Sequence, residues 1–169
     1  MVQLYIAGAN GLLALSVPIV KPDTIKCPTK DIRISDHGEW RHLHWNAIAS
    51  AYGSSPFFEY YQDDIRPFFE KRYEFLLDFN EEIRRTVCDL IGLEPHIEYS
   101  SSYSEPAPGE TDLRDAIHPK KRKAETILPV QPKPYYQVFS EKYGFQPGLS
   151  IIDLLMNMGP ESILILQNA

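Results

Sequence analysis

The chain has 169 residues, of which 43% are hydrophobic and 24% are charged, values typical of a folded globular protein. This length predicts a single domain over residues 1–169 with a buried core. The formal net charge of −6 gives no general attraction to phosphate backbones, so we expect no nucleic-acid partner. Two cysteines make no disulfide framework, and there is neither a signal-peptide pattern nor an apolar run of about 18 residues. We therefore expect a cytoplasmic protein without a transmembrane segment.

The N-terminal residues predict a β-hairpin. Two runs of β-type composition, Val2–Ile6 and Leu12–Val20, flank Asn10-Gly11, and both residues of this pair tolerate the positive φ of a type I′ turn. The second run is apolar on both faces, which indicates a central position in a sheet. Asp31–Ser35 alternates between polar and apolar residues and predicts a further short strand.

Helical spacing and terminal residues predict the helices. Ser35 or Asp36, together with Glu39, is a candidate capping box for a helix that ends near Tyr52. The other expected helices are Pro56–Lys71 with a break at Pro67, Asp78–Ile91 with a stop at Gly92, and Ser150–Met158. Tyr135–Tyr143 suits either a strand or a short helix. These elements predict an α+β fold, in which a small antiparallel sheet with the N-terminal hairpin packs against a cluster of three or four helices.

The segment Gly38–Tyr61 concentrates two tryptophans, two histidines, an arginine and five Phe or Tyr rings. In helical register, Trp40, His44 and Ile48 share a mostly apolar face. His44 is therefore either a hydrogen-bonded core histidine or a general base at the edge of the core, where a neutral imidazole takes a proton from an amine or hydroxyl nucleophile. The other histidine, His42, is two residues from His44, a spacing that cannot chelate one metal ion on a helix.

Arg41 falls on the adjoining face of the same predicted helix. One interpretation is a surface ion pair with Glu39 or Asp36. The other is a bidentate clamp for a carboxylate or phosphate group of a substrate. The sequence leaves both open, because a neighbouring carboxylate and a ligand anion use the same guanidinium donors.

The C-terminal helix carries a second candidate group. Ser150 can cap this helix, and Asp153 in its first turn can stabilise the helix dipole and bond back to the cap. In the functional interpretation, Asp153 is instead a catalytic carboxylate that pairs with His44, with Arg41 or with a substrate amine. Asn157 shares its face one turn later and would contact substrate.

Two further residues suggest substrate contacts, whereas nothing suggests a cofactor. Tyr136 and Gln137 supply a hydroxyl and an amide, groups that commonly bind sugar hydroxyls. The glycine-containing segment Gly8–Gly11 leads into a strand and lacks the lysine of a phosphate-binding loop. The histidines have no ligand-like spacing, so we expect neither a metal site nor a cofactor.

Four segments, in this order and spacing, resemble the WbqC-like family of bacterial proteins. They are ANGLLALSVPIV at 9–20, HGEWRHLHWNAIASAYGSSPFFEYY at 37–61, YYQVF at 135–139 and LSIIDLLMNMGPES at 149–162. The resemblance extends from about residue 4 to residue 166, and the second and last segments carry its specificity. Family members usually begin with an extra segment rich in Pro, Tyr and Phe that precedes the hairpin. This segment is expected to be missing here, because the chain starts at Met1-Val2-Gln3.

The resemblance implies a role in the biosynthesis of O-antigen or another surface polysaccharide. It implies a group transferase, of glycine or another aminoacyl group, that acts on a sugar or a lipid-linked sugar intermediate. Together with the co-occurrence of the polar groups above, it assigns catalytic roles to His44 and Asp153. Substrate contacts are assigned to Arg41, Tyr136, Gln137 and Asn157.

The alternative hypothesis is a non-enzymatic binding or assembly module in the same pathway, since no phosphate loop, metal motif or obvious nucleophile is present. An exposed first strand would also favour pairing with another chain, which predicts a homo-oligomer.

Overall fold

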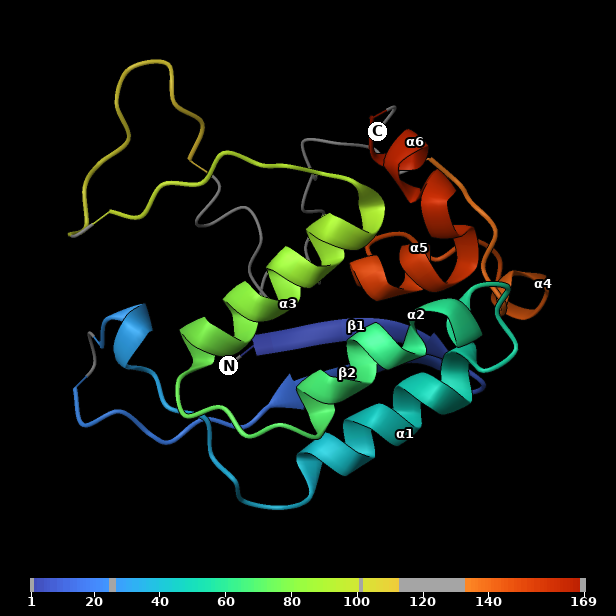
Figure 1. Ribbon diagram of the computed structural model, residues 1–169, viewed down its shortest axis with the longest axis horizontal. Coiled ribbons are helices and arrows are strands. Elements are labelled where there is room, and N and C mark those ends of the chain that lie inside the picture. The colour runs from blue at the N-terminus through green and yellow to red at the C-terminus, as the bar shows by residue number, and fades with distance from the viewer. Residues whose placement is uncertain (1, 25–26, 101, 113–132, 168–169) are drawn as a thin grey trace.

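The computed structural model describes residues 2–24, 27–100, 102–112 and 133–167. It shows an α+β fold, as predicted, in which two antiparallel strands, β1 (Val2–Gly8) and β2 (Gly11–Val17), pack against helices. The helices are α1 (Trp40–Tyr52), α2 (Phe58–Ile65), α3 (Leu76–Ile91), α4 (Ser140–Tyr143), α5 (Ile151–Met158) and α6 (Ser162–Gln167), with short 3-10 helices η1 (Thr29–Asp31), η2 (Arg66–Phe69) and η4 (Gly159–Glu161). In the view of Figure 1, the hairpin lies between α1 on one side and α3 and α5 on the other. Both α1 and α5 contact β1.

The β-hairpin is confirmed, but its turn differs from the prediction. The strands pair up to Gly8 opposite Gly11, which leaves Ala9 and Asn10 as the two turn residues. Neither of these has a positive φ, and a positive φ of 100° falls on Gly11 instead. The type I′ turn was therefore a wrong prediction. Ala9 carries a Cβ that disfavours the left-handed region, whereas Gly11 adopts a positive φ without this cost.

The strand β2 does not lie centrally in a larger sheet, contrary to the prediction. The sheet of the described residues has two strands, and Leu12 and Leu13 at the start of β2 are 53% and 41% exposed. Although β2 carries apolar residues on both faces, the strand is therefore not buried on both faces. Residues 31–35, predicted as a short strand, form only isolated bridges at Arg33 and Ile34.

The helix α1 begins at Trp40 without the predicted capping box. Glu39 is the N-cap residue and makes no side-chain cap hydrogen bond. Ser35 Oγ accepts a hydrogen bond from the His37 N–H at 3.2 Å, and Asp36 forms ion pairs. These polar residues therefore order the turn before the helix, which brings Asp36 beside the first turn of α1.

The predicted starts of two helices are wrong, because α2 begins at Phe58 instead of Pro56 and α3 begins at Leu76 instead of Asp78. Other helix ends agree with the sequence. Pro67 divides the second predicted helix, since α2 ends before it and η2 contains it. Gly92 ends α3 with a φ of 68°, and Ser150 Oγ accepts the Ile152 N–H at 3.4 Å as the cap of α5. The segment Tyr135–Tyr143 ends in the short helix α4, one of the two structures expected for it.

The hydrophobic core lies between β1, α1, α2 and α5. Its most deeply buried apolar side chains are those of Ile6, Ile48, Tyr52, Ile65, Leu155 and Met156. Burial of one large apolar side chain contributes about 1.5–3 kcal/mol. On α5, every residue from 152 to 157 is buried, including two polar ones. Because buried polar groups need hydrogen-bond partners, these two side chains must find partners within the protein.

Gly159, at the junction of α5 and η4, allows the close approach of an aromatic ring. Its φ is 55°, and an added Cβ would lie 2.5 Å from ring carbons of Phe57. We expect Gly159→Ala to lower the free energy of unfolding by about 1–3 kcal/mol, because the ring must move and the backbone conformation is strained. Urea denaturation measures this, with Gly8→Ala as the control, since a Cβ there makes an ordinary 3.6 Å contact. Equal denaturation midpoints for the two variants would contradict this expectation.

Candidate functional site

The side chains predicted for a site fall into two clusters and one exposed position. We define the α1 cluster as Asp36, Trp40, Arg41, His44 and Arg72. We define the Asp153 cluster as Tyr52, Tyr135, Gln137, Asp153 and Asn157. Tyr136 belongs to neither cluster and is 54% exposed.

His44 is enclosed by aromatic rings. It is 6% exposed, and its ring centroid lies 5.2 Å from that of Trp40 and 6.3 Å from that of Phe69, both in edge-on geometry. Burial lowers the pKa of the His44 imidazole below its ordinary value of 6.5. Its Nδ1 atom is buried and has no hydrogen-bond partner among the described residues. The side chain is therefore a neutral imidazole near neutral pH, with one ring nitrogen that no described residue engages.

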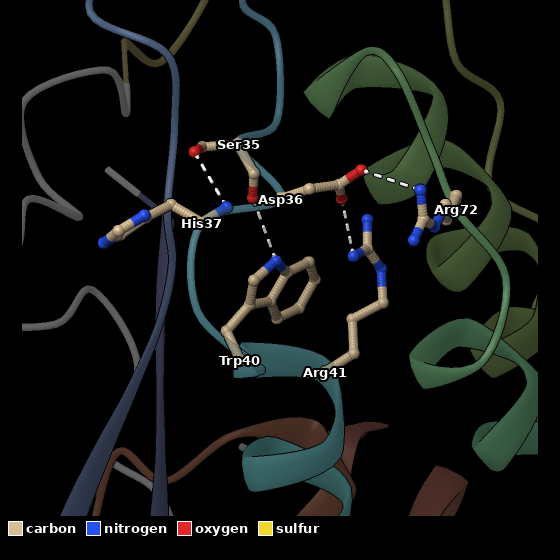
Figure 2. Close-up of polar contacts among 6 residues, drawn as sticks. All are labelled: Ser35, Asp36, His37, Trp40, Arg41 and Arg72. Carbon is tan, nitrogen blue, oxygen red and sulfur yellow. Dashed lines mark hydrogen bonds and ion pairs between the residues drawn. The ribbon is translucent and has the colours of Figure 1, made fainter.

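The guanidinium group of Arg41 is held beside the first turn of α1 (Figure 2). Its Nη1 donates to Asp36 Oδ1 at 2.7 Å, and the group lies over the Trp40 ring at 4.7 Å from the centroid. The other oxygen of Asp36 is 3.5 Å from Nη1 of Arg72. The hydrogen bond from Arg41 holds the pKa of the Asp36 carboxyl below its usual range. Of the two ion-pair partners left open by the sequence, Asp36 is therefore the one that Arg41 contacts.

The other side of the Arg41 guanidinium makes no hydrogen bond to any described residue. Its Nε and Nη2 atoms are buried and have no hydrogen-bond partner among the described residues. Arg41 and His44 are three residues apart in α1, so they are neighbours on the helix surface. The α1 cluster thus combines two unpartnered donor nitrogens of Arg41 with one unpartnered imidazole nitrogen of His44.

The low pKa of His44 predicts a pH dependence of stability. Between its lowered folded pKa and 6.5, the unfolded chain binds more protons at this residue than the folded one. His44 therefore makes the protein less stable as the pH falls through this window. We expect His44→Gln to lose less stability than wild type between about pH 7.5 and pH 5. Urea denaturation across this range tests this, with the exposed His37→Gln as control, which should follow the wild-type curve.

Asp153 is the centre of a buried hydrogen-bond network. Its Oδ1 accepts from the Tyr52 hydroxyl at 2.9 Å, and its Oδ2 accepts from the Tyr135 hydroxyl at 2.7 Å and from Gln137 Nε2 at 3.1 Å. Asp153 is 1% exposed, and this burial raises the pKa of its carboxyl, although all three donors act in the opposite direction. Burial also raises the pKa of both tyrosine hydroxyls, so they remain donors. The carboxylate thus links α1, α5 and the segment that precedes α4.

Gln137 and Asn157 extend this network with further bonds to the protein. Gln137 Oε1 accepts the Gln146 N–H at 2.8 Å, and its Nε2 also donates to the Gln146 carbonyl at 3.0 Å. Asn157 Nδ2 donates to the backbone carbonyl of Asp153 at 2.7 Å. Both side chains are almost fully buried. The Gln137 amide therefore serves mainly to order the chain around α5, whereas Asn157 Oδ1 is buried and has no hydrogen-bond partner among the described residues.

The sequence model of the WbqC-like protein family matches residues 1–165. The chain belongs to this family. It is also similar to "Uncharacterized protein Rv1507c" of Mycobacterium tuberculosis (strain ATCC 25618 / H37Rv), with 24% identity over 179 aligned residues that cover 93% of this chain and 77% of that protein. No solved structure shows significant similarity to the chain.

In this WbqC-like protein, the two clusters lie at opposite ends of α1. Tyr52 follows His44 by eight residues, a rise of about 12 Å along a helix. Within the described ranges, no hydrogen bond or ion pair joins Asp153 to His44 or Arg41. The structure thus brings His44 and Arg41 together, places Asp153 with Gln137 and Asn157, and leaves the predicted pairing between the two groups unmade.

The sequence did not identify several partners in this WbqC-like protein. Arg72 follows η2 and reaches Asp36 from a distant part of the chain, and Phe69 lies against His44 in the same way. No local pattern signals either contact, because both depend on how η2 packs against α1. The described residues contain no group of three or more His, Cys, Asp or Glu side chains that could hold a metal ion. In the same part of the chain, no helix has the length and apolar character needed to cross a bilayer.

Proposed function

We propose that this WbqC-like protein is a cytoplasmic group transferase that acts in the assembly of O-antigen or another surface polysaccharide. Its substrate is a sugar or a lipid-linked sugar intermediate, and the transferred group is glycine or another aminoacyl group. Family membership supports the pathway. The α1 cluster supports the type of chemistry.

The observation that carries this proposal is the set of unpartnered polar atoms in the α1 cluster. Buried donors and acceptors are nearly always hydrogen-bonded, because an unpaired one costs about 1–3 kcal/mol. Here two nitrogens of Arg41, Nε and Nη2, and one ring nitrogen of His44 lack a partner among the described residues, on neighbouring positions of one helix. A ligand that carries an anionic group and a hydroxyl or amine would satisfy all three atoms.

The proposed reaction uses one base and one anion clamp. A hydroxyl or amine of the sugar attacks the carbonyl carbon of an activated aminoacyl donor. The new C–O or C–N bond forms, and the bond between the carbonyl carbon and the leaving group breaks. His44, neutral because burial lowers its pKa, takes the proton of the nucleophile and returns it to the leaving group. Arg41 holds the anionic part of the donor or the acceptor in place.

We assign the Asp153 cluster a supporting role in this proposal. Both carboxylate oxygens of Asp153 already accept hydrogen bonds from the protein, and Gln137 is engaged on both ends of its amide. Such groups have little capacity left for a substrate. Tyr136, which is exposed, remains a proposed surface contact for a sugar ring.

A second candidate function is a binding or assembly module without catalysis in the same pathway. The hydrogen bonds of Asp153 to Tyr52 and Tyr135 favour it, because His44, the proposed base, then has no carboxylate to orient it. In that case the α1 cluster would bind a glycan or partner without changing it. The two functions differ in whether His44 is needed for a covalent change in the polysaccharide.

Mass spectrometry of molecules that co-purify with the protein tests the proposal. The wild-type protein should carry an aminoacyl, nucleotide-sugar or lipid-linked sugar species, and Arg41→Ala should lose it. Arg84→Ala, which removes an arginine from α3, is the matched control and should retain it. A ligand that survives Arg41→Ala and is lost with Arg84→Ala would contradict the assignment of the site.

A further inference from the structure

Two partly buried arginines of this chain use their guanidinium groups in different ways. In Arg84, both Nε and Nη2 donate to Glu81 Oε2, at 3.1 and 2.7 Å. In Arg41, Asp36 accepts from Nη1, and the Nε and Nη2 atoms have no partner among the described residues. The same edge of the guanidinium is thus bound by a carboxylate in Arg84, whereas in Arg41 no described residue binds it.

The shape of this edge defines what can bind to it. The N–H of Nε and one N–H of Nη2 point in parallel directions from the side of the guanidinium. This pair of donors matches the two oxygens of a carboxylate or of a phosphoryl group in a bidentate arrangement. A single oxygen can accept from both donors, as Glu81 Oε2 does from those of Arg84, but a neutral hydroxyl or carbonyl group offers neither the negative charge nor the second oxygen.

The Arg41 edge is held in a fixed direction. Asp36 binds the opposite part of the guanidinium at 2.7 Å, and the Trp40 indole lies beneath it at 4.7 Å. The indole is itself fixed, because Trp40 Nε1 donates to the Ser35 carbonyl at 3.1 Å (Figure 2). An anion that meets such a preorganised donor pair loses less affinity to side-chain ordering.

Arg72 provides a second positive charge beside Asp36, on the solvent-exposed side of the ion pair. Its side chain is 82% exposed, that of Asp36 is 52% exposed and that of Arg41 is 14% exposed. The Arg72–Asp36 contact of 3.5 Å is the longest ion pair in the described part of the chain. Arg72 can therefore turn aside at little cost and then contact an anion bound to Arg41. With Asp36 included, these three groups carry a net charge of 2 − 1 = +1, in a chain whose net charge is −6.

We infer that the Nε–Nη2 edge of Arg41 is a binding subsite for a two-oxygen anion, with Arg72 as its second cationic contact. The anion is either the carboxylate of an amino acid or a phosphoryl oxygen pair of a diphosphate-linked sugar. The role of this anion in a reaction rests on the proposed transferase function. Binding of the anion does not rest on it, because binding can be measured without any group transfer.

The test is an NMR titration of the arginine Nε–H signals of the full chain with two probes, glycine and inorganic pyrophosphate. We expect the Arg41 signal to shift and saturate with one of them, and the probe that acts identifies the carboxylate or the phosphoryl source. Arg41→Lys should weaken this binding at least about tenfold, because lysine keeps the charge but lacks the fork. Arg84→Lys is the matched control and should leave the affinity unchanged.

Three results would overturn the inference. They are no saturable shift of Arg41 with either probe, equal shifts of Arg41 and Arg84, or full affinity in Arg41→Lys. Failure of the proposed function looks different. In that case the anion binds as expected, but the polysaccharide is unchanged when His44 is replaced.

Discussion

Replacing Asp153 by alanine should lower the free energy of unfolding by about 3–5 kcal/mol. The variant leaves the hydroxyls of Tyr52 and Tyr135 and one N–H of Gln137 near a cavity without their acceptor. Each buried donor that loses its acceptor costs about 1–3 kcal/mol, and the three losses share one site, so they do not add fully. Urea denaturation at neutral pH measures the change.

Two further variants make this expectation specific. Asp63→Ala removes an exposed carboxylate from α2 and should change stability by less than about 0.5 kcal/mol. Tyr135→Phe removes one donor and keeps the ring, so it should cost about 1 kcal/mol. A loss for Asp153→Ala no larger than that for Asp63→Ala would show that the Asp153 cluster does not support the fold.

Replacing His44 by glutamine should reduce modification of the polysaccharide by about 10²–10⁴-fold, the usual contribution of a general base. Glutamine fills a similar space but cannot take a proton. Because the natural substrate need not be known, the readout is the mass of the polysaccharide repeat unit from cells that express the variant in place of the wild-type protein. The modified repeat should disappear while the variant remains folded.

The matched control for this prediction is His42→Gln, which makes the same substitution on the same helix. His42 is exposed and its ring contacts Asn46, outside the α1 cluster. This variant should keep the modified repeat at the wild-type level. If the folded His44→Gln variant keeps the modified repeat, His44 is not the general base, and the binding or assembly module is favoured.

Local features of the fold could be predicted because their causes lie within a few residues. Gly92 ends α3, Pro67 divides the second helix and Ser150 caps α5, each through steric or hydrogen-bond effects on its near neighbours. Predictions failed where the same residues could make two different sets of local hydrogen bonds. Ser35 and Asp36 could cap α1, but they order the preceding turn and pair with arginine instead.

The partners of the candidate site residues could not be predicted in the same way. Asp153 and Tyr52 are separated by 101 positions, and only the packing of α5 against α1 brings them together. The sequence placed Asp153 in the first turn of α5 and Arg41 on the face of α1 next to His44, which the structure shows. It could not show that both oxygens of Asp153 accept hydrogen bonds from the protein while two nitrogens of Arg41 have no acceptor among the described residues. These contacts depend on residues that are distant in the sequence.

The central claim is that ligand chemistry belongs to the α1 cluster, whereas the Asp153 cluster holds the fold together. The most direct test measures the polysaccharide repeat by mass spectrometry in cells that express Arg41→Lys or Tyr135→Phe, with the urea midpoint of each purified variant alongside. We expect Arg41→Lys to lose the modified repeat while it remains folded, and Tyr135→Phe to keep it at a lowered midpoint. The reverse pattern, a modified repeat retained by Arg41→Lys and lost by folded Tyr135→Phe, would contradict the account.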